Sequence, residues 1–130
     1  MANFSTSLDT AVLKHIFGVA TYTPGTIQIA LYTTNPTMPA GTGGTETVYT
    51  NYARVTISSS AWGTPTGTAT NSVSAITFAA CGATGATITG WGIYDANSGT
   101  VPIIGGTCSL VVSSGITPVF NTSQLTVTLS

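Results

Sequence analysis

Apolar and polar residues alternate in several short series after residue 26. The clearest series are residues 27–32, 54–57, 76–78 and 125–129, in which Ile, Leu, Val or Phe stands at every second position. A period of two residues is typical of β-strands that bury one face. The pattern therefore predicts a protein made mainly of strands.

Residues 87–94 predict a further strand with apolar groups on both faces. Simple alternation places Ile88 and Tyr94 on one face and Trp91 and Ile93 on the other. Because Trp91 stands between two glycines within a strand, we expect it to pack in the core rather than on the surface.

A turn follows this strand at residues 95–99 and leads into another strand at residues 101–104, which together predict a β-hairpin. Asp95 favours the start of such a turn, because its side chain can accept hydrogen bonds from nearby backbone amides. Residues 110–112 are apolar throughout and predict a strand that is buried on both faces.

One helix is predicted near the start, over about residues 7–18. Ser and Thr residues just before it can cap its first turn, and Gly18 is a natural stop. The apolar residues of this segment recur at helical spacing, beginning with Leu8, Val12 and Ile16. We therefore expect an amphipathic helix.

Short alternating strands separated by Gly, Thr and Pro predict an all-β fold, either an antiparallel β-sandwich or a partly open barrel, with one short N-terminal helix. The chain has 130 residues. This length favours a single domain over residues 1–130.

Two segments, residues 33–51 and 58–74, are too long and too rich in Gly and Pro for simple turns. Tyr49 and Trp62 lie in them and Tyr52 directly follows the first, and such aromatic residues are enriched at protein interfaces. We interpret the three as candidate assembly contacts, with Trp62 lying outside the core. The alternative is that both segments are mobile surface loops.

Charge is scarce. Only 4% of the residues are charged, against about 25% in typical soluble domains. The charged residues are Asp9, Lys14, Glu46, Arg54 and Asp95. Two cations cannot neutralise a run of phosphates, so we expect neither nucleic-acid binding nor attraction to an acidic membrane surface.

The residues that catalysis requires are equally few. His15 is the only histidine, and it lies at the end of the predicted helix with no second base or ligand nearby in the sequence. A pair of catalytic carboxylates would have to combine Glu46 with Asp95, and Asp95 already has a role in a turn. We expect no enzymatic activity, no metal and no cofactor.

Cys81 and Cys108 fit no metal-binding spacing. The sequence shows neither a signal peptide nor an apolar run of membrane-spanning length, which favours synthesis in the cytoplasm. Thiols in that compartment are usually reduced, so we expect both cysteines to be free, with a disulfide as the alternative.

Several short motifs, taken in order, give the chain a family resemblance. They are the opening helix that ends at Phe17-Gly18, Leu31-Tyr32-Thr33 followed by Asn35-Pro36, Tyr52-Ala53-Arg54, Ile76-Thr77-Phe78, Trp91-Gly92-Ile93-Tyr94-Asp95-Ala96 and Leu125-Thr126-Val127-Thr128-Leu129. In this order and spacing the chain resembles small virion proteins of tailed bacteriophages, described as tail-fibre or head-decoration proteins. The segment after residue 97 and the position of Cys108 depart from the family pattern.

The resemblance implies a virion structural protein made in the host cytoplasm, and it implies no catalytic residues. The leading expectation is a capsid decoration, or cement, protein that binds the major capsid protein as a homo-oligomer, with a trimer favoured. The alternative is a structural protein of the tail, baseplate or fibre, with other tail proteins as partners. A carbohydrate-binding module that uses Trp62 or Trp91 as a stacking platform is a third expectation.

Overall fold

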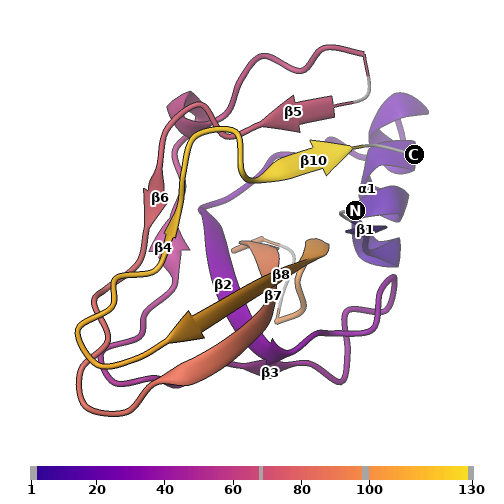
Figure 1. The fold of residues 1–130 in the computed structure, drawn as a ribbon. Helices are drawn as coiled ribbons and strands as arrows, with labels where there is room; N and C mark the ends of the chain where they lie inside the picture. Colours follow the sequence, from indigo (N-terminus) through magenta and orange to yellow (C-terminus); the bar gives the residue numbers. More distant parts are fainter. Residues whose placement is uncertain (1–2, 68, 98–99, 129–130) are drawn as a thin grey trace.

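The computed structural model describes residues 3–67, 69–97 and 100–128, and strands dominate it (Figure 1). Its central sheet has six antiparallel strands in the order β1–β8–β7–β2–β3, with β4 also paired to β2. Their bounds are β1 Asn3–Phe4, β2 Ile27–Thr34, β3 Thr45–Glu46, β4 Val55–Thr56, β7 Ala86–Asp95 and β8 Ile104–Val112. The prediction of an all-β fold with one short N-terminal helix is confirmed, and the central sheet is antiparallel.

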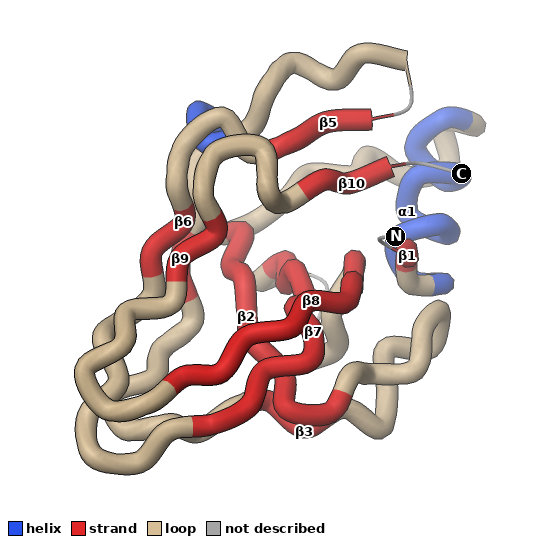
Figure 2. Tube along the Cα trace, in the orientation of Figure 1, coloured by secondary structure: helices blue, strands red, loops and turns tan. Residues whose placement is uncertain are grey.

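Two small two-stranded sheets complete the fold on one side of the central sheet (Figure 2). One pairs β5 (Ala69–Asn71) with β10 (Thr126–Thr128), and the other pairs β6 (Ile76–Thr77) with β9 (Val119–Phe120). The main core lies between these layers, because its buried residues come from both: Ile29, Leu31, Trp91 and Ile93 from the central sheet, and Ile76, Phe78, Leu125 and Val127 from the smaller sheets or beside them.

Strand β2 shows how the alternating pattern produces two faces. Ile29 and Leu31 belong to the main core, whereas Ala30 and Tyr32 form a second buried cluster with Tyr94. The central sheet is therefore covered on both faces along β2, and Figure 1 shows the loop after β2 folding back beside it.

Strand β7 departs from simple alternation. Ile88 lies in the same core cluster as Trp91 and Ile93, not on the face of Tyr94 as predicted. The register of β7 against β8 shifts between Ile88 and Gly90, and such an irregularity changes which face the following residues occupy.

Strand β8 also differs from the prediction. The strand predicted at residues 101–104 begins only at Ile104 and continues through residues 110–112 as one strand, β8, so the predicted hairpin is present with a later second strand. The prediction that residues 110–112 are buried on both faces is wrong. Val111 is 66% exposed, so only one face of this part of β8 is covered. Residues 98 and 99 of the predicted turn lie outside the described residues.

The two long segments, residues 33–51 and 58–74, contain short elements of secondary structure that the alternating apolar pattern did not predict. The first includes β3 and an isolated bridge between Thr37 and Thr42. The second includes a 3-10 helix, Ser59–Ala61, and β5. These elements are only two or three residues long, so their pairing depends on strands supplied by distant parts of the chain.

Helix α1 spans Thr6–Ile16. The Ser5 side chain caps it by accepting a hydrogen bond from the Leu8 amide at 3.2 Å. Gly18 ends it with a positive φ of 68°, while the amides of Gly18 and Val19 bind the carbonyls of His15 and Lys14. This is a Schellman motif, so the predicted glycine stop is confirmed.

Candidate functional site

Asp95 ends β7 and has no exposed surface. One carboxylate oxygen accepts hydrogen bonds from the amides of Gly25 and Asn97, at 2.8 and 2.9 Å. The other accepts from the Tyr22 hydroxyl at 2.6 Å. The bond to Asn97 is the turn contact that the sequence predicted, and the other two attach the segment before β2 to the hairpin.

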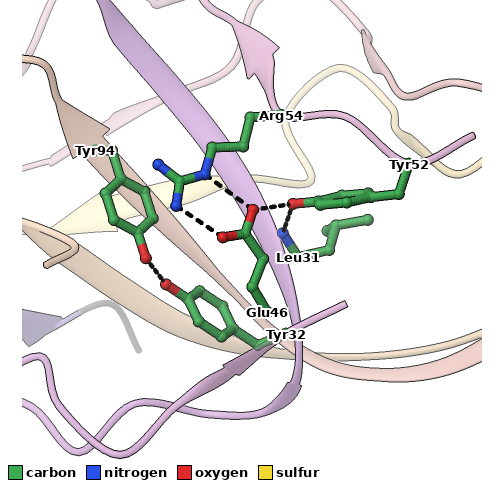
Figure 3. Close-up of polar contacts among 6 residues, drawn as sticks. All are labelled: Leu31, Tyr32, Glu46, Tyr52, Arg54 and Tyr94. Carbon is green, nitrogen blue, oxygen red and sulfur yellow. Dashed lines mark hydrogen bonds and ion pairs between the residues drawn. The ribbon is translucent and has the colours of Figure 1, made fainter. Parts of the chain in front are cut away.

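Glu46 and Arg54 form an ion pair beside the sheet face that carries Tyr32 and Tyr94 (Figure 3). The Arg54 guanidinium donates two hydrogen bonds to the Glu46 carboxylate, at 2.9 and 2.7 Å. It also lies 3.7 Å from the centre of the Tyr94 ring, in cation–π contact. Tyr94 in turn is hydrogen-bonded to the Tyr32 hydroxyl.

The same cluster reaches the backbone of β2 through Tyr52. Its hydroxyl donates to Glu46 at 2.7 Å and accepts from the Leu31 amide at 3.0 Å (Figure 3). The cluster thus joins β3, the segment just before β4, β2 and β7 by side-chain contacts. Burial and the hydrogen bond to Tyr94 raise the pKa of Tyr32, and burial and the bond to Glu46 raise that of Tyr52, so both hydroxyls stay neutral.

Acidification is expected to remove the stabilisation that Glu46 provides. Burial alone would raise the pKa of Glu46, but hydrogen bonds from Arg54 and Tyr52 and the charge of Arg54 outweigh it and lower the pKa. A carboxyl whose pKa is lowered by folding stabilises the protein above its unfolded pKa of about 4.3, and this contribution disappears as the pH falls through the folded pKa.

We therefore expect Glu46→Gln to lower the free energy of unfolding by about 1–2 kcal/mol at neutral pH, since Arg54 and Tyr52 lose a charged acceptor. The difference between variant and parent should shrink as the pH falls to about 3, as thermal unfolding can measure. Asp9→Asn, on the exposed side of α1, is the control. An equal difference at both pH values would contradict this account.

The three candidate assembly residues occupy different environments. Tyr49 is 2% exposed, and its hydroxyl donates to the Ala79 carbonyl at 2.9 Å. Its side chain therefore offers no surface to a neighbouring subunit in this fold. Tyr52 is half-buried and packs against Tyr49 and Phe78 as well as binding Glu46. Both tyrosines hold the first long segment to the domain.

Trp62 is half-buried and packs against the main core. The expectation that it lies outside the core is wrong, because Trp62 pairs with Ser72 in an isolated bridge that holds its segment against the smaller sheets. The exposed part of its side chain lines a hollow of about 170 Å³, which we call the Trp62 hollow.

The largest group of exposed apolar side chains lies on α1 and just after it. Of nine large apolar residues exposed in the described part of the chain, five fall within residues 12–19. They are Val12, Leu13, Ile16, Phe17 and Val19, which we call the α1 apolar end. The predicted amphipathic stripe is present, but only Leu8 is buried against the domain, because the later turns of α1 extend beyond it.

The single histidine, His15, stabilises the reversal of the chain after α1. The Tyr22 amide donates to His15 Nδ1 at 3.2 Å. In the ranges that the structure describes, no three His, Cys, Asp or Glu side chains come together as metal ligands. No helix of those ranges has the length and apolar character needed to cross a membrane.

Both cysteines are free in the structure. Cys81 is 3% exposed, and burial raises the pKa of the half-buried Cys108 thiol. Since the thiolate is the reactive form, we expect slow labelling of Cys108 and protection of Cys81 in the folded protein. Denaturation without reductant should expose both thiols to the label, as mass spectrometry can count. A pair that stays unlabelled after denaturation would instead indicate a disulfide.

Comparison with protein families gives one match, described as podophage GP4 fiber I protein gp80, over residues 3–128. No curated protein matches the chain. The family match spans the helix, the central sheet and both smaller sheets, so it concerns the whole fold and not one motif. The chain belongs to this podophage fibre family and is a structural protein of the phage virion.

Proposed function

We propose that this protein is a structural subunit of a podophage tail fibre and that it acts by assembly, without catalysis. The observation that carries the proposal is the family match over residues 3–128, whose description names a fibre. This match supports the tail or fibre role, the alternative from the sequence, better than capsid decoration. The proposed partners are further copies of the chain and other tail proteins.

The carboxylates of Glu46 and Asp95 support a structural role, because the structure already uses both. Glu46 is committed to Arg54 and Tyr52, and Asp95 accepts hydrogen bonds from three donors. A group held this way loses native stabilisation whenever it changes its protonation state. Trp91 is only 5% exposed, which leaves no ring face for a sugar and weighs against one form of the carbohydrate-binding alternative.

Labelling of intact virions tests the proposed location. Gold-conjugated antibodies raised against the isolated chain should mark the tail or its fibres in electron micrographs. The same antibodies, absorbed beforehand with the isolated chain, are the control and should leave the particles unmarked. Gold distributed over the head would contradict the proposal and favour capsid decoration.

A further inference from the structure

The α1 apolar end is a rigid feature of the surface. The Schellman motif at Gly18 fixes the backbone on both sides of Phe17, and the Phe17 amide binds the Leu13 carbonyl at 3.0 Å. The chain that follows is attached through Tyr22, which contacts both His15 and Asp95. Phe17 is nevertheless 75% exposed, so its ring projects from a well-supported position.

The Trp62 hollow has matching chemistry. It lies between the central sheet and the β5–β10 pair, and its lining includes Trp62, Ile93, Ile104 and Val127. Thr70 is the one polar residue among its seven lining residues, and none of them is charged. We therefore expect an uncharged and mainly apolar occupant, because nothing in the lining could pair with a charge.

The hollow and the Phe17 side chain also match in size. An apolar cavity of about 150 Å³ in another protein binds benzene. The Trp62 hollow, at about 170 Å³, has a similar volume, which is the size that a phenyl ring requires. Phe17 does not fill the hollow of its own chain, since three quarters of its surface is exposed.

Every copy of the chain carries both features. We propose that the α1 apolar end of one copy places Phe17 in the Trp62 hollow of the next copy. Such a contact joins two different surfaces, and repeating it closes a ring when the rotation between copies allows. The inference rests on the proposed function only for the expectation that copies assemble, and it adds the surface through which they do so.

The exposed area of the α1 apolar end is sufficient for its own side of this contact. The α1 apolar end offers on the order of 500 Å² per copy, so covering it with an equal area of a neighbour buries on the order of 1,000 Å², the lower limit for a specific interface. Near neutrality adds to this, because a chain with five charged residues brings little like-charge repulsion between copies.

Oligomer mass in solution is the first test. We expect the parent to associate as concentration rises, measured by light scattering after size exclusion, and Phe17→Ser to raise the dissociation constant about 10- to 100-fold. Val48→Ser removes a side chain that is 89% exposed elsewhere, and it should leave association unchanged. A parent that is monomeric throughout, or equal effects of the two variants, would overturn the inference.

Disulfide trapping distinguishes this contact from simple packing of one helix against another. Ile16→Cys, beside Phe17, and Thr70→Cys, in the hollow, should form an intermolecular disulfide when the two single-variant chains are mixed. Ile16→Cys alone should form none. A disulfide between two Ile16→Cys chains, or from position 16 to native Cys108, would show a different contact and overturn the inference.

These tests use the isolated chain, so their failure is separate from failure of the proposed function. Circular dichroism and thermal unfolding at low concentration should show that Phe17→Ser folds as the parent does, since the Phe17 ring lies largely outside the fold. If the parent chain were monomeric, the contact between copies would be contradicted but the proposed tail location would not. If gold labelled the head, the tail location would be contradicted but the contact between copies in solution would not.

Discussion

Replacing Trp91 by Ala is expected to lower the free energy of unfolding by about 3–5 kcal/mol, the usual cost of deleting a buried Trp. Trp91 is 5% exposed, lies in the middle of β7 and packs in the main core between the central and smaller sheets. Small domains are stable by only about 5–15 kcal/mol, so this change alone removes a large part of the total. Urea unfolding monitored by far-ultraviolet circular dichroism measures it.

Gly106 provides a matched test of the same contact. A Cβ at this position would lie 2.5 Å from Cζ2 of the Trp91 ring, so Gly106→Ala forces the ring aside. We expect a loss of about 1–3 kcal/mol in the parent and much less in the Trp91→Ala background, where the ring is absent. Additive effects of the two changes would contradict the packing described here.

Replacing Asp95 by Ala is expected to have a comparable effect, about 3–5 kcal/mol, because it leaves the Gly25 and Asn97 amides and the Tyr22 hydroxyl without their acceptor. For a chain of this length that corresponds to a fall in melting temperature of about 10–20 °C. Amide hydrogen exchange should show the largest loss of protection in residues 22–25, which Asp95 attaches to the hairpin.

Asp9→Ala is the control for the loss of one carboxylate, since Asp9 is exposed in the first turn of α1. It should change stability by no more than about 0.5 kcal/mol. Asp95→Asn keeps part of the acceptor geometry and should fall between the two. Equal stability of Asp95→Ala and Asp9→Ala would show that the buried carboxylate is not the anchor that its contacts indicate.

Local signals in the sequence were sufficient for several elements. The cap at Ser5 and the stop at Gly18 fix the helix because they satisfy its own terminal backbone groups. The alternation around Ile29 and Leu31 defines β2 because one buried face repeats every second residue. The turn contact of Asp95 could be predicted because its partner, the Asn97 amide, is only two residues away.

Features that depend on distant partners could not be predicted in this way. The face of Ile88 follows from a shift in register against β8. The strands β3 and β5 are too short to have a period of their own, and they form only on β2 and β10. Similarly, the helical pattern predicts an apolar face on α1 but not how much of that face the rest of the domain covers, and the last turns of α1 are exposed.

The candidate contacts show the same limit. An aromatic residue in a long segment can equally well contact another subunit or hold the segment to its own domain. Only the fold shows that Tyr49 does the latter and that Trp62 borders a hollow. The Glu46–Arg54 pair had one usable signal, because two opposite charges eight residues apart are conspicuous in a chain with five charged residues.

The most direct test of the central claim, that this protein acts as an assembled part of the tail, is a cryo-electron microscopy reconstruction of the virion tail. We predict density that fits this fold in repeated copies at a fibre or its attachment point. A map at a resolution that shows side chains should place the α1 apolar end of one copy at the Trp62 hollow of its neighbour. A tail reconstruction without such density, together with density for this fold on the capsid surface, would contradict the account.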